Sequence, residues 1–408
     1  MGKRTGILIM VMILTLIGCG TGNEKKAMTA ETQPEESREE LLLSYYWETE
    51  NHQKALEQVI QKYNLSQDKY FLTTKYIPFA DFNKSLSISI AGNDSPDLVI
   101  VDIADFASYA SMGVFEDLTD RLDTSEYYEN AMQSCTMDGR VYGIPFGCNS
   151  LAFFYNESLL KEAQTEVPKT WEELKEAAVR LSGNKVCGLA FSGVQYEEGT
   201  FNYLPWLWSA GADYDGIDSE NGIRALQYIR DLTISGGLSR EIINWTQGDV
   251  MNQFAAGNVA MMINGSWQIP TMREMDLDFE WNVTAIPRDQ FAVSGFGGEN
   301  FAVLKGNHVD GAIDFLNFVT SKEQVEQYID EFGYLSARMD VAEQQYQGDA
   351  VMQVFTEQMQ YARMRGPHPE WPEISDAISG AFNKVIIEEG SISQVAKEAQ
   401  EKIDKIVW

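Results

Sequence analysis

Residues 96–102 read PDLVIVD, an unbroken aliphatic run between a proline and an aspartate. A continuous Leu/Val/Ile run of this length predicts a strand buried on both faces, which is typical of parallel sheets covered by helices. A segment with helical character follows at 104–112 and stops at Gly113. This stretch therefore favours an α/β layer architecture.

The residues before this strand show the same alternation. LLLSYYW at 41–47 and YFLTTKYI at 70–77 have the length and composition of strands, whereas 51–63 and 79–91 carry apolar residues at helical spacing. The order strand, helix, strand, helix, strand is expected of a sheet with helices on its faces.

Later segments extend the pattern. GRVYGIP at 139–145 and LAFFY at 151–155 predict two strands, and Thr170 with Glu173 has the spacing of a capping box that opens a helix. Residues 259–264 and 281–286 predict further strands, and 310–320 predicts a helix. The chain beyond position 40 is too long for one ordinary core, which indicates two lobes.

The N-terminus predicts export. Lys3 and Arg4 precede an apolar run at 7–17, which is shorter than the roughly 20 residues that span a bilayer and has the size of a signal-peptide core. The run ends in LIGC at 16–19, which resembles the lipobox of bacterial lipoproteins. The resemblance implies a signal peptide at 1–18, lipidation of Cys19, and anchoring at the extracellular face of the cell membrane.

Residues 19–40 are rich in charge and poor in large apolar side chains, so we expect a lipidated flexible tether. The whole chain has 31 Lys and Arg against 61 Asp and Glu, a net charge of −30. This charge argues against nucleic acid and against a basic membrane-binding patch. Cys135, Cys148 and Cys187 are odd in number and widely spaced, and we expect buried free thiols.

Seven segments, taken in order, resemble the family 1 extracellular solute-binding proteins, the sugar-binding components of ABC importers. The segments are AGNDSPDLVIVD (91–102), YASMGVFEDLT (109–119), GRVYGIPFGCNSLAFFYNESLL (139–160), PKTWEEL (168–174), FAAGNVAMMINGSW (254–267), AIDFLNFVTSKEQ (312–324) and GYLSAR (333–338). Together they extend the resemblance over nearly the whole chain, from about 41 to 406.

The resemblance implies a two-lobed periplasmic-binding-protein-like fold with discontinuous lobes joined by crossover hinge strands. The N-terminal lobe would comprise 41–149 plus 286–333, and the C-terminal lobe 150–285 plus 334–408. Ligand would bind in the cleft between them, in agreement with the rule that open α/β sheets bind at the carboxyl ends of strands. We expect cleft closure by hinge bending.

The resemblance also implies the partners. They are a carbohydrate ligand, a mono- or oligosaccharide, and the permease subunits of an ABC transporter. We expect a monomer with no cofactor, no metal, no catalytic residue and no membrane contact beyond the lipid.

Sugars present hydroxyl groups and patches of C–H bonds, so a sugar site needs aromatic faces and planar polar groups. Trp267 is the first candidate, because it follows a predicted strand and the matching tryptophan of the family stacks on a sugar ring. Trp47 and Glu50 flank the end of the first strand, and one residue of 47–50 is expected to contact ligand. Asp102 is placed either to accept sugar hydroxyls or to cap the next helix.

The remaining candidates are less specific. Asn149 and Ser150 are polar residues at the first crossover, and either binding or backbone bonding would explain them. Trp206 and Trp208 flank a leucine, and Trp206 is favoured for the cleft. Residues 295–300 (GFGGEN) lack the third glycine of a dinucleotide fingerprint.

In the family, the glycine-rich segment approaches the ligand, which makes Gly298 and Asn300 candidates. Arg365 could bridge two hydroxyls or a carboxylate, or form a surface salt bridge instead.

Two other functions stay open. A secreted glycoside hydrolase would use paired carboxylates, which an acidic chain always offers. No GxSxG, P-loop or HExxH motif is present, and the three histidines lie far apart. The same fold could also bind a peptide, a polyamine, iron or a phosphonate in place of a sugar.

Overall fold

A computed structural model of the chain describes residues 38–407. The predicted signal peptide, Cys19 and most of the predicted tether lie outside these residues. Strand β1 (Glu39–Tyr45) begins before the predicted tether ends, so residues 39–40 belong to the sheet. The Glu39 N–H donates to the Lys69 carbonyl at 3.0 Å, which joins the start of β1 to the residue before the next strand.

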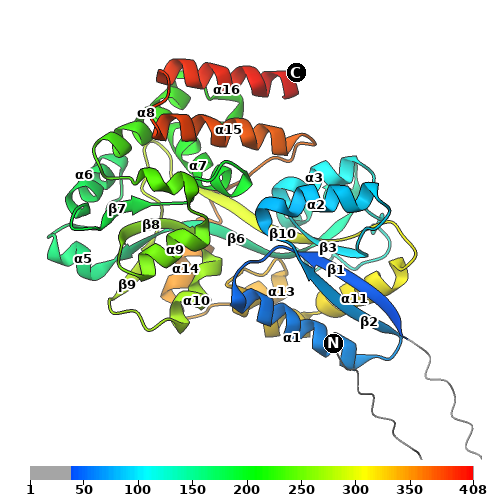
Figure 1. The fold of residues 1–408 in the computed structure, drawn as a ribbon. Helices are drawn as coiled ribbons and strands as arrows, with labels where there is room; N and C mark the ends of the chain where they lie inside the picture. The colour runs from blue at the N-terminus through cyan, green and yellow to red at the C-terminus, as the bar shows by residue number, and fades with distance from the viewer. Residues whose placement is uncertain (1–37, 408) are drawn as a thin grey trace, which may run out of the picture. The chain divides into compact units, whose positions relative to one another are not determined.

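The first lobe is built around parallel strands. β1 pairs with β2 (Tyr70–Tyr76) on one side and with β3 (Leu98–Asp102) on the other. Every residue of β3 is buried, which confirms the prediction for 96–102. The sheet lies between two pairs of helices (Figure 1), which are α1 (Glu50–Ser66) with α11 (Val309–Val319), and α2 (Phe79–Ala91) with α3 (Ile103–Ser111).

A single long strand, β6 (Gly143–Asn156), is shared by the two lobes. Its first half pairs with β10 (Ser294–Val303), and its second half pairs with β8 (Val259–Gly265) and β9 (Trp281–Thr284). Since β10 also pairs with β3, one sheet runs through the molecule in the order β2-β1-β3-β10-β6-β8-β7.

The prediction of separate strands at 139–145 and 151–155 was therefore wrong. Residues 146–150 are buried and are paired with β10 for most of their length, so they continue the strand instead of forming a loop. Only the short strand β5 (Arg140–Val141) precedes β6 in this region.

The second lobe carries most of the helices. β7 (Cys187–Ala190) runs parallel to β8, and α6 (Trp171–Leu181) opens with the predicted capping box. The Glu173 N–H donates to Thr170 Oγ1 at 3.2 Å, and the Thr170 N–H donates to Glu173 Oε2 at 3.3 Å.

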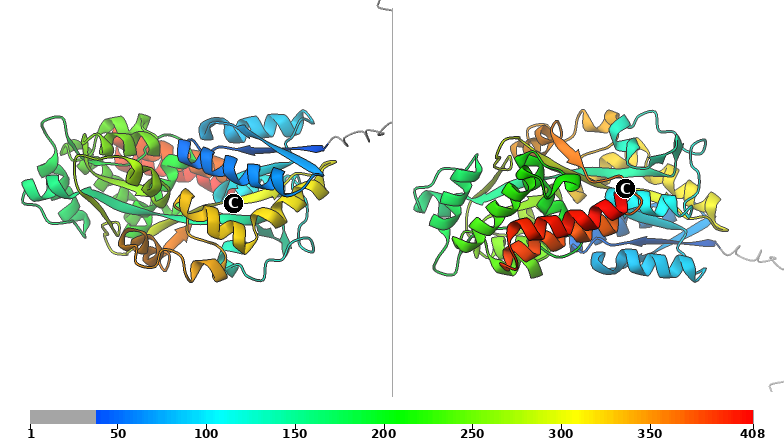
Figure 2. Two further views of the ribbon diagram at one scale, coloured as in Figure 1. Left: turned by 90° about the horizontal axis from the view of Figure 1, so that it is seen from below. Right: turned by 90° about the horizontal axis from the view of Figure 1, so that it is seen from above.

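Helices α15 (Trp371–Ile386) and α16 (Ile392–Val407) pack together along one side of this lobe (Figure 2). The other elements of this half of the sheet and its surroundings are α5 (Glu157–Glu162), α7 (Glu197–Ala210), η1 (Tyr214–Gly216), α8 (Glu220–Ile234), η2 (Arg240–Asn244), α9 (Gln247–Ala255), η3 (Ser266–Gln268), α10 (Ile269–Glu274), α14 (Ala350–Gln358) and β11 (Ala362–Met364). The remaining short elements are α4 (Glu129–Gln133), β4 (Thr136–Met137), α12 (Lys322–Tyr328), η4 (Ile329–Phe332) and α13 (Met339–Ala342).

The chain is thus the two-lobed α/β protein that its sequence predicts. We keep the lobe borders as a proposal, with one crossing inside β6, one after β9 and one at Gly333–Leu335. At the third crossing, Cys148 and Leu335 exchange two backbone hydrogen bonds of 2.8 Å, so this segment runs beside β6.

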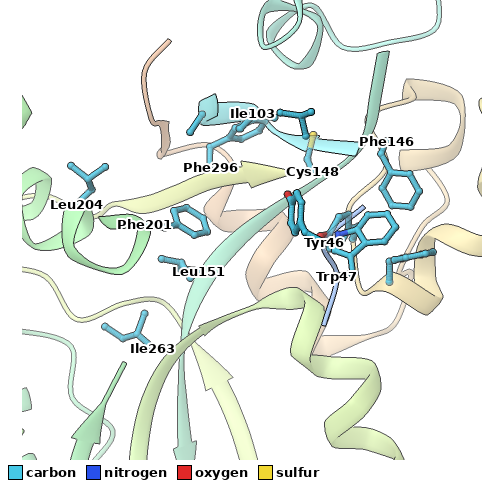
Figure 3. Close-up of a cluster of buried hydrophobic side chains, with 14 of the residues drawn as sticks. Tyr46, Trp47, Ile103, Phe146, Cys148, Leu151, Phe201, Leu204, Ile263 and Phe296 are labelled. Atoms are coloured by element: carbon cyan, nitrogen blue, oxygen red, sulfur yellow. The ribbon is translucent and has the colours of Figure 1, made fainter. Parts of the chain in front are cut away.

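The buried core continues from one lobe into the other. Figure 3 shows Phe146, Cys148 and Leu151 of β6 in one cluster with Tyr46 and Trp47, the two residues that follow β1. The three cysteines of the described chain are free thiols, and Cys135 and Cys148 are buried as expected, whereas Cys187 is partly exposed. No helix within 38–407 combines the length and the hydropathy needed to cross a bilayer.

Candidate functional site

A cavity lies where the two lobes meet. Its water-accessible interior is about 120 Å³, and the hollow as a whole, including the open solvent at its mouth, is about 730 Å³. Side chains from the loop after β1 and from α1, α2, β3, β6 and β10 meet side chains from α7, α9 and η3 in its walls. The lining combines aromatic rings with carboxyl, carboxamide and guanidinium groups.

Trp47 forms the aromatic surface on the side of the first lobe. It lies two residues after the end of β1 and is only 4% exposed. Its ring packs against Phe146 and Phe332, with centroid distances of 4.8 and 4.7 Å. This packing fixes the position of the Trp47 ring before any ligand enters.

Trp267 forms the aromatic surface on the side of the second lobe. A Cβ atom on Gly265, the last residue of β8, would lie 1.9 Å from the Trp267 ring, so only glycine lets the ring fold back over the strand end. Trp267 is partly exposed, and it stacks on Phe201 at 6.1 Å with an angle of 19° between the rings.

The glycines of β10 make room for two lining side chains. A Cβ on Gly297 would lie 2.3 Å from Asn149 Oδ1, and a Cβ on Gly295 would lie 2.3 Å from the Phe201 ring. The expected approach of this segment to the ligand therefore takes another form, in which bare backbone leaves space for Asn149 and Phe201.

Glu299 is a buried carboxyl of the first lobe. Its Oε1 accepts hydrogen bonds from the hydroxyls of Tyr46 at 3.1 Å and Tyr334 at 2.9 Å. Burial, helped by the charge of Asp102, raises the pKa of Glu299 to about 8.

Glu198 occupies the corresponding place in the second lobe, in the first turn of α7. It accepts hydrogen bonds from the Gln247 N–H and from the Tyr196 hydroxyl, the latter at 3.1 Å. Burial raises the pKa of Glu198 to about 7, and burial also raises the pKa of Glu48, at the cavity mouth.

Arg365 links carboxylates of both lobes. Its Nη2 donates to both oxygens of Asp102 at 3.1 and 3.2 Å, and its Nη1 donates to Glu197. The Phe201 ring lies 3.9 Å from the centre of the guanidinium, and Arg365 is only 2% exposed. Asp102 also caps α3 by accepting the Ala104 N–H at 2.8 Å, so both roles considered for Asp102 are compatible with one position.

His52 contributes a neutral ring. It is buried and its Nε2 lies 3.1 Å from the Phe332 carbonyl. Burial lowers the pKa of His52 to about 4, so the ring carries no charge at neutral pH.

Six polar atoms of the lining are buried and have no hydrogen-bond partner within residues 38–407. Trp47 Nε1, Gln247 Nε2 and Arg365 Nε are donors, Asn149 Oδ1 and Gln268 Oε1 are acceptors, and Glu299 Oε2 donates when the carboxyl is protonated and accepts when it is ionised. Buried polar groups normally find partners, and leaving one unpaired costs about 1–3 kcal/mol. A concentration of such atoms in one cavity indicates a ligand that both donates and accepts hydrogen bonds.

Half of the residues expected from the sequence lie in this cavity: Trp47, Asp102, Asn149, Trp267 and Arg365. Arg365 does not form the surface salt bridge considered as its alternative, because its partners are buried with it.

The other five lie elsewhere. Glu50 is the first residue of α1 and pairs with Lys54 at 2.7 Å on the surface, and Ser150 is buried against the Phe355 carbonyl at 3.5 Å. Trp206 packs in the second lobe against Phe191 at 5.5 Å, and its neighbour Trp208 also lies outside the cavity.

Gly298 and Asn300 belong to β10 but do not line the cavity. Gly298 has a φ of 141° and faces the Gly147 carbonyl, where a Cβ would lie only 2.2 Å away. Asn300 is turned to Ser134, with Nδ2 donating to Ser134 Oγ at 3.0 Å, and so contributes to the packing of the first lobe.

Several lining residues were not anticipated from the sequence. They are Tyr46, Glu48, Thr49, His52, Phe79, Glu198, Phe201, Gln247, Gly248, Gln268, Glu299 and Tyr334. Glu48 and Thr49 fall inside the segment 47–50 that was expected to supply a contact, and Gln268 follows Trp267 directly. The others come from segments whose meeting depends on the fold of both lobes.

Comparison with known proteins places the fold. A family model described as bacterial extracellular solute-binding protein matches residues 58–354. The chain is 20% identical over 351 residues to the multiple sugar-binding protein of Streptococcus mutans, covering 81% of each protein. It is 24% identical over 348 residues to the arabinooligosaccharide-binding protein of Bacillus subtilis, covering 78% of this chain and 76% of that one.

A solved structure agrees with this. The fold matches an ABC transporter solute binding protein from Thermotoga lettingae, bound with alpha-D-tagatose, at a TM-score of 0.84 and 24% identity, covering 91% of this chain and 100% of that chain. The family resemblance and the two-lobed fold predicted from the order of motifs are confirmed.

Proposed function

Because this chain belongs to the bacterial extracellular solute-binding protein family, we propose that it captures a carbohydrate, a mono- or oligosaccharide, in the cavity between its lobes. The relatives named above are themselves binding proteins for sugars by name, which supports the same ligand class here.

The observation that carries the proposal is the pairing of aromatic faces with unpaired polar atoms. Trp47 and Trp267 offer rings from the two lobes, and the unpaired donors and acceptors lie in the same cavity. A sugar hydroxyl donates one hydrogen bond and accepts others, and its ring offers C–H patches to an aromatic face. A ligand with both properties satisfies this lining without an ionic contact.

We propose Trp47, Asp102, Asn149, Trp267 and Arg365 as site residues. Trp47 and Trp267 would stack on the sugar, Asn149 would bond to hydroxyls, and Arg365 would hold Asp102 in place. Glu198, Gln247, Gln268 and Glu299 join them on the strength of their place in the lining.

We further propose that the protein delivers its ligand to the permease subunits of an ABC transporter as a monomer. Export through the signal peptide at 1–18 and lipidation of Cys19 would hold it at the extracellular face of the membrane. A receptor on a flexible tether reaches only its own membrane surface, where a permease is found. Replacement of Cys19 by serine should abolish the incorporation of labelled fatty acid that the wild type shows, as detected by metabolic labelling and immunoprecipitation.

The proposal makes the protein a binder and not a glycoside hydrolase. The Glu299 carboxyl is held by two tyrosine hydroxyls and Asp102 by Arg365, so both are engaged in bonds that fix them. A thermal-shift screen of the mature protein against a carbohydrate panel tests binding, because a ligand of the native state raises apparent stability. Release of new reducing ends from an oligosaccharide would contradict the proposal, and so would the absence of any carbohydrate that shifts the transition.

A further inference from the structure

We infer that the cavity takes uncharged or cationic sugars and excludes anionic ones, such as uronic acids and sugar phosphates. The inference rests on the proposed function and narrows its ligand class. It is drawn from the charges of the lining, from the bonds made by its one arginine, and from the helix ends that open toward the cavity.

Carboxyl groups dominate the lining. Glu48, Asp102, Glu198 and Glu299 face the cavity, and no lysine of residues 38–407 lines it. Burial raises the pKa of Glu198 to about 7 and the pKa of Glu299 to about 8, so at neutral pH these two carboxyls are partly or largely protonated. They give an anion no positive partner, and Glu48 and Asp102 place acidic oxygens beside it, which makes charge a basis of specificity. Glu197 and Asp105 add two further buried carboxyls behind the wall formed by Asp102.

The one cation of the lining is already neutralised. Both amino groups of the Arg365 guanidinium donate to carboxylates, and one face of its plane is covered by the Phe201 ring. Only Nε is left without a partner, which suits a single hydroxyl oxygen better than a carboxylate that would seek two parallel bonds. His52 adds no charge, since it is buried and neutral.

At each of three helix ends beside the cavity, one backbone N–H is bonded to an oxygen of the protein itself. An N-terminal helix end can bind an anion through its free N–H groups. At α3 the Ala104 N–H already donates to Asp102, and at α9 the Gln247 N–H donates to Glu198. At α1 the His52 N–H donates to Thr49 Oγ1 at 3.4 Å. An anion at any of these three helix ends would therefore lie beside an acceptor oxygen of the protein that already holds one of the N–H groups.

The inference that the cavity excludes anions can be tested before the sugar is identified. Trp267 is partly exposed in the cavity, so the fluorescence difference between the wild type and Trp267→Phe isolates its signal among nine tryptophans. At constant ionic strength, acrylamide and caesium should quench this signal, whereas iodide should quench it several-fold less, each relative to free tryptophanamide.

Two matched variants separate the cavity from the net charge of the protein. Glu48→Gln removes a carboxyl from the lining and should raise iodide quenching, whereas Glu50→Gln removes one from the surface of α1 and should not. Equal quenching by iodide and caesium, or equal effects of the two variants, would overturn the inference.

The ligand class is tested with the sugar found by the thermal-shift screen. Its C6-oxidised uronate and its 6-phosphate should bind about tenfold more weakly or worse. An anionic derivative that binds as tightly as its uncharged parent overturns this inference and leaves the sugar proposal intact. If uncharged solutes of another class bind and sugars do not, the sugar proposal fails and the exclusion of anions stands.

Discussion

Trp47 and Trp267 line one cavity from different lobes, but they depend on the fold to different degrees. Trp47 is buried between Phe146 and Phe332, so its ring is part of the core that supports the first lobe. Trp267 is partly exposed and touches the aromatic groups of the described chain only through Phe201. The Trp47 side of the cavity is therefore part of the core, whereas the Trp267 ring has fewer aromatic neighbours to support it.

Replacing Trp47 by alanine should have the largest effect. Removing a buried tryptophan lowers the free energy of unfolding by about 3–5 kcal/mol, and binding should be lost with the ring. Urea denaturation followed by circular dichroism measures the first, and isothermal titration with the identified sugar measures the second. Trp47→Phe should retain most of the stability. A loss below about 1 kcal/mol in the alanine variant would contradict the assignment of Trp47 to the core.

Arg365 joins the two walls of the cavity. Its replacement should have the second-largest effect on stability. In Arg365→Met, the buried carboxylates of Asp102 and Glu197 lose their partner, which costs about 3 kcal/mol or more. Arg363, two positions earlier, forms an exposed pair with Asp213, and Arg363→Met should cost less than about 1 kcal/mol. Equal denaturation midpoints for the two variants would refute the structural role of Arg365.

Trp267 should act on affinity more than on stability. Trp267→Ala should weaken sugar binding by roughly 1–3 kcal/mol, the value of burying a large apolar side chain. Trp245 is a partly buried tryptophan of the same lobe outside the cavity, so Trp245→Ala serves as the matched control. Titration calorimetry of both variants gives the comparison, and unchanged affinity in Trp267→Ala would remove this ring from the site.

The smallest expected effect is the dependence of the unfolding free energy on pH. The pKa of Glu299 is about 8 in the folded protein and near 4.5 when unfolded, so the folded state holds the proton more strongly. The stability that Glu299 contributes is therefore fully present below about pH 4.5 and is lost as pH rises through 8, by about 2 kcal/mol between pH 6 and 8. The stability that Glu198 contributes also falls as pH rises, because burial raises the pKa of Glu198 to about 7.

Glu299→Gln isolates the contribution of one carboxyl. The variant should show a flatter dependence of the unfolding free energy on pH than the wild type, in urea titrations at pH 5, 6, 7 and 8. A parallel pair of curves would show that Glu299 titrates alike in both states.

The sequence predicts this fold well because its signals are local. The aliphatic run at 98–101 can only be a buried strand, and the capping box of Thr170 and Glu173 forms within one helical turn. Trp47 and Trp267 were accessible to prediction for the same reason, since each stands just beyond the end of a strand.

The rest of the site depends on which face of a strand a residue occupies. Successive side chains of a strand point to opposite faces, so a shift of one residue changes the outcome. Asn149 lines the cavity and Ser150 does not, and Glu299 lines it while Asn300 faces Ser134. A β-bulge between Glu299 and Asn300 alters the register further, which the residue types do not reveal.

Trp206 shows a second limit. It lies in α7, a helix buried along its whole length, so periodicity cannot distinguish a side facing the cavity from a side facing the core. Phe201 and Glu198 come from the same helix and do reach the cavity, because its first turns are the ones that lie next to β10.

The strand β6, which belongs to both lobes, has a mechanical consequence. Because β6 is continuous between the lobes, opening the lobes would bend and twist β6 and β10 while the hydrogen bonds between them stay intact. The strain in the bent strands would then favour the return of the lobes to their original angle. The backbone amides of 146–153 should then exchange slowly with deuterium whether or not ligand is bound, while those near Trp267 respond to it.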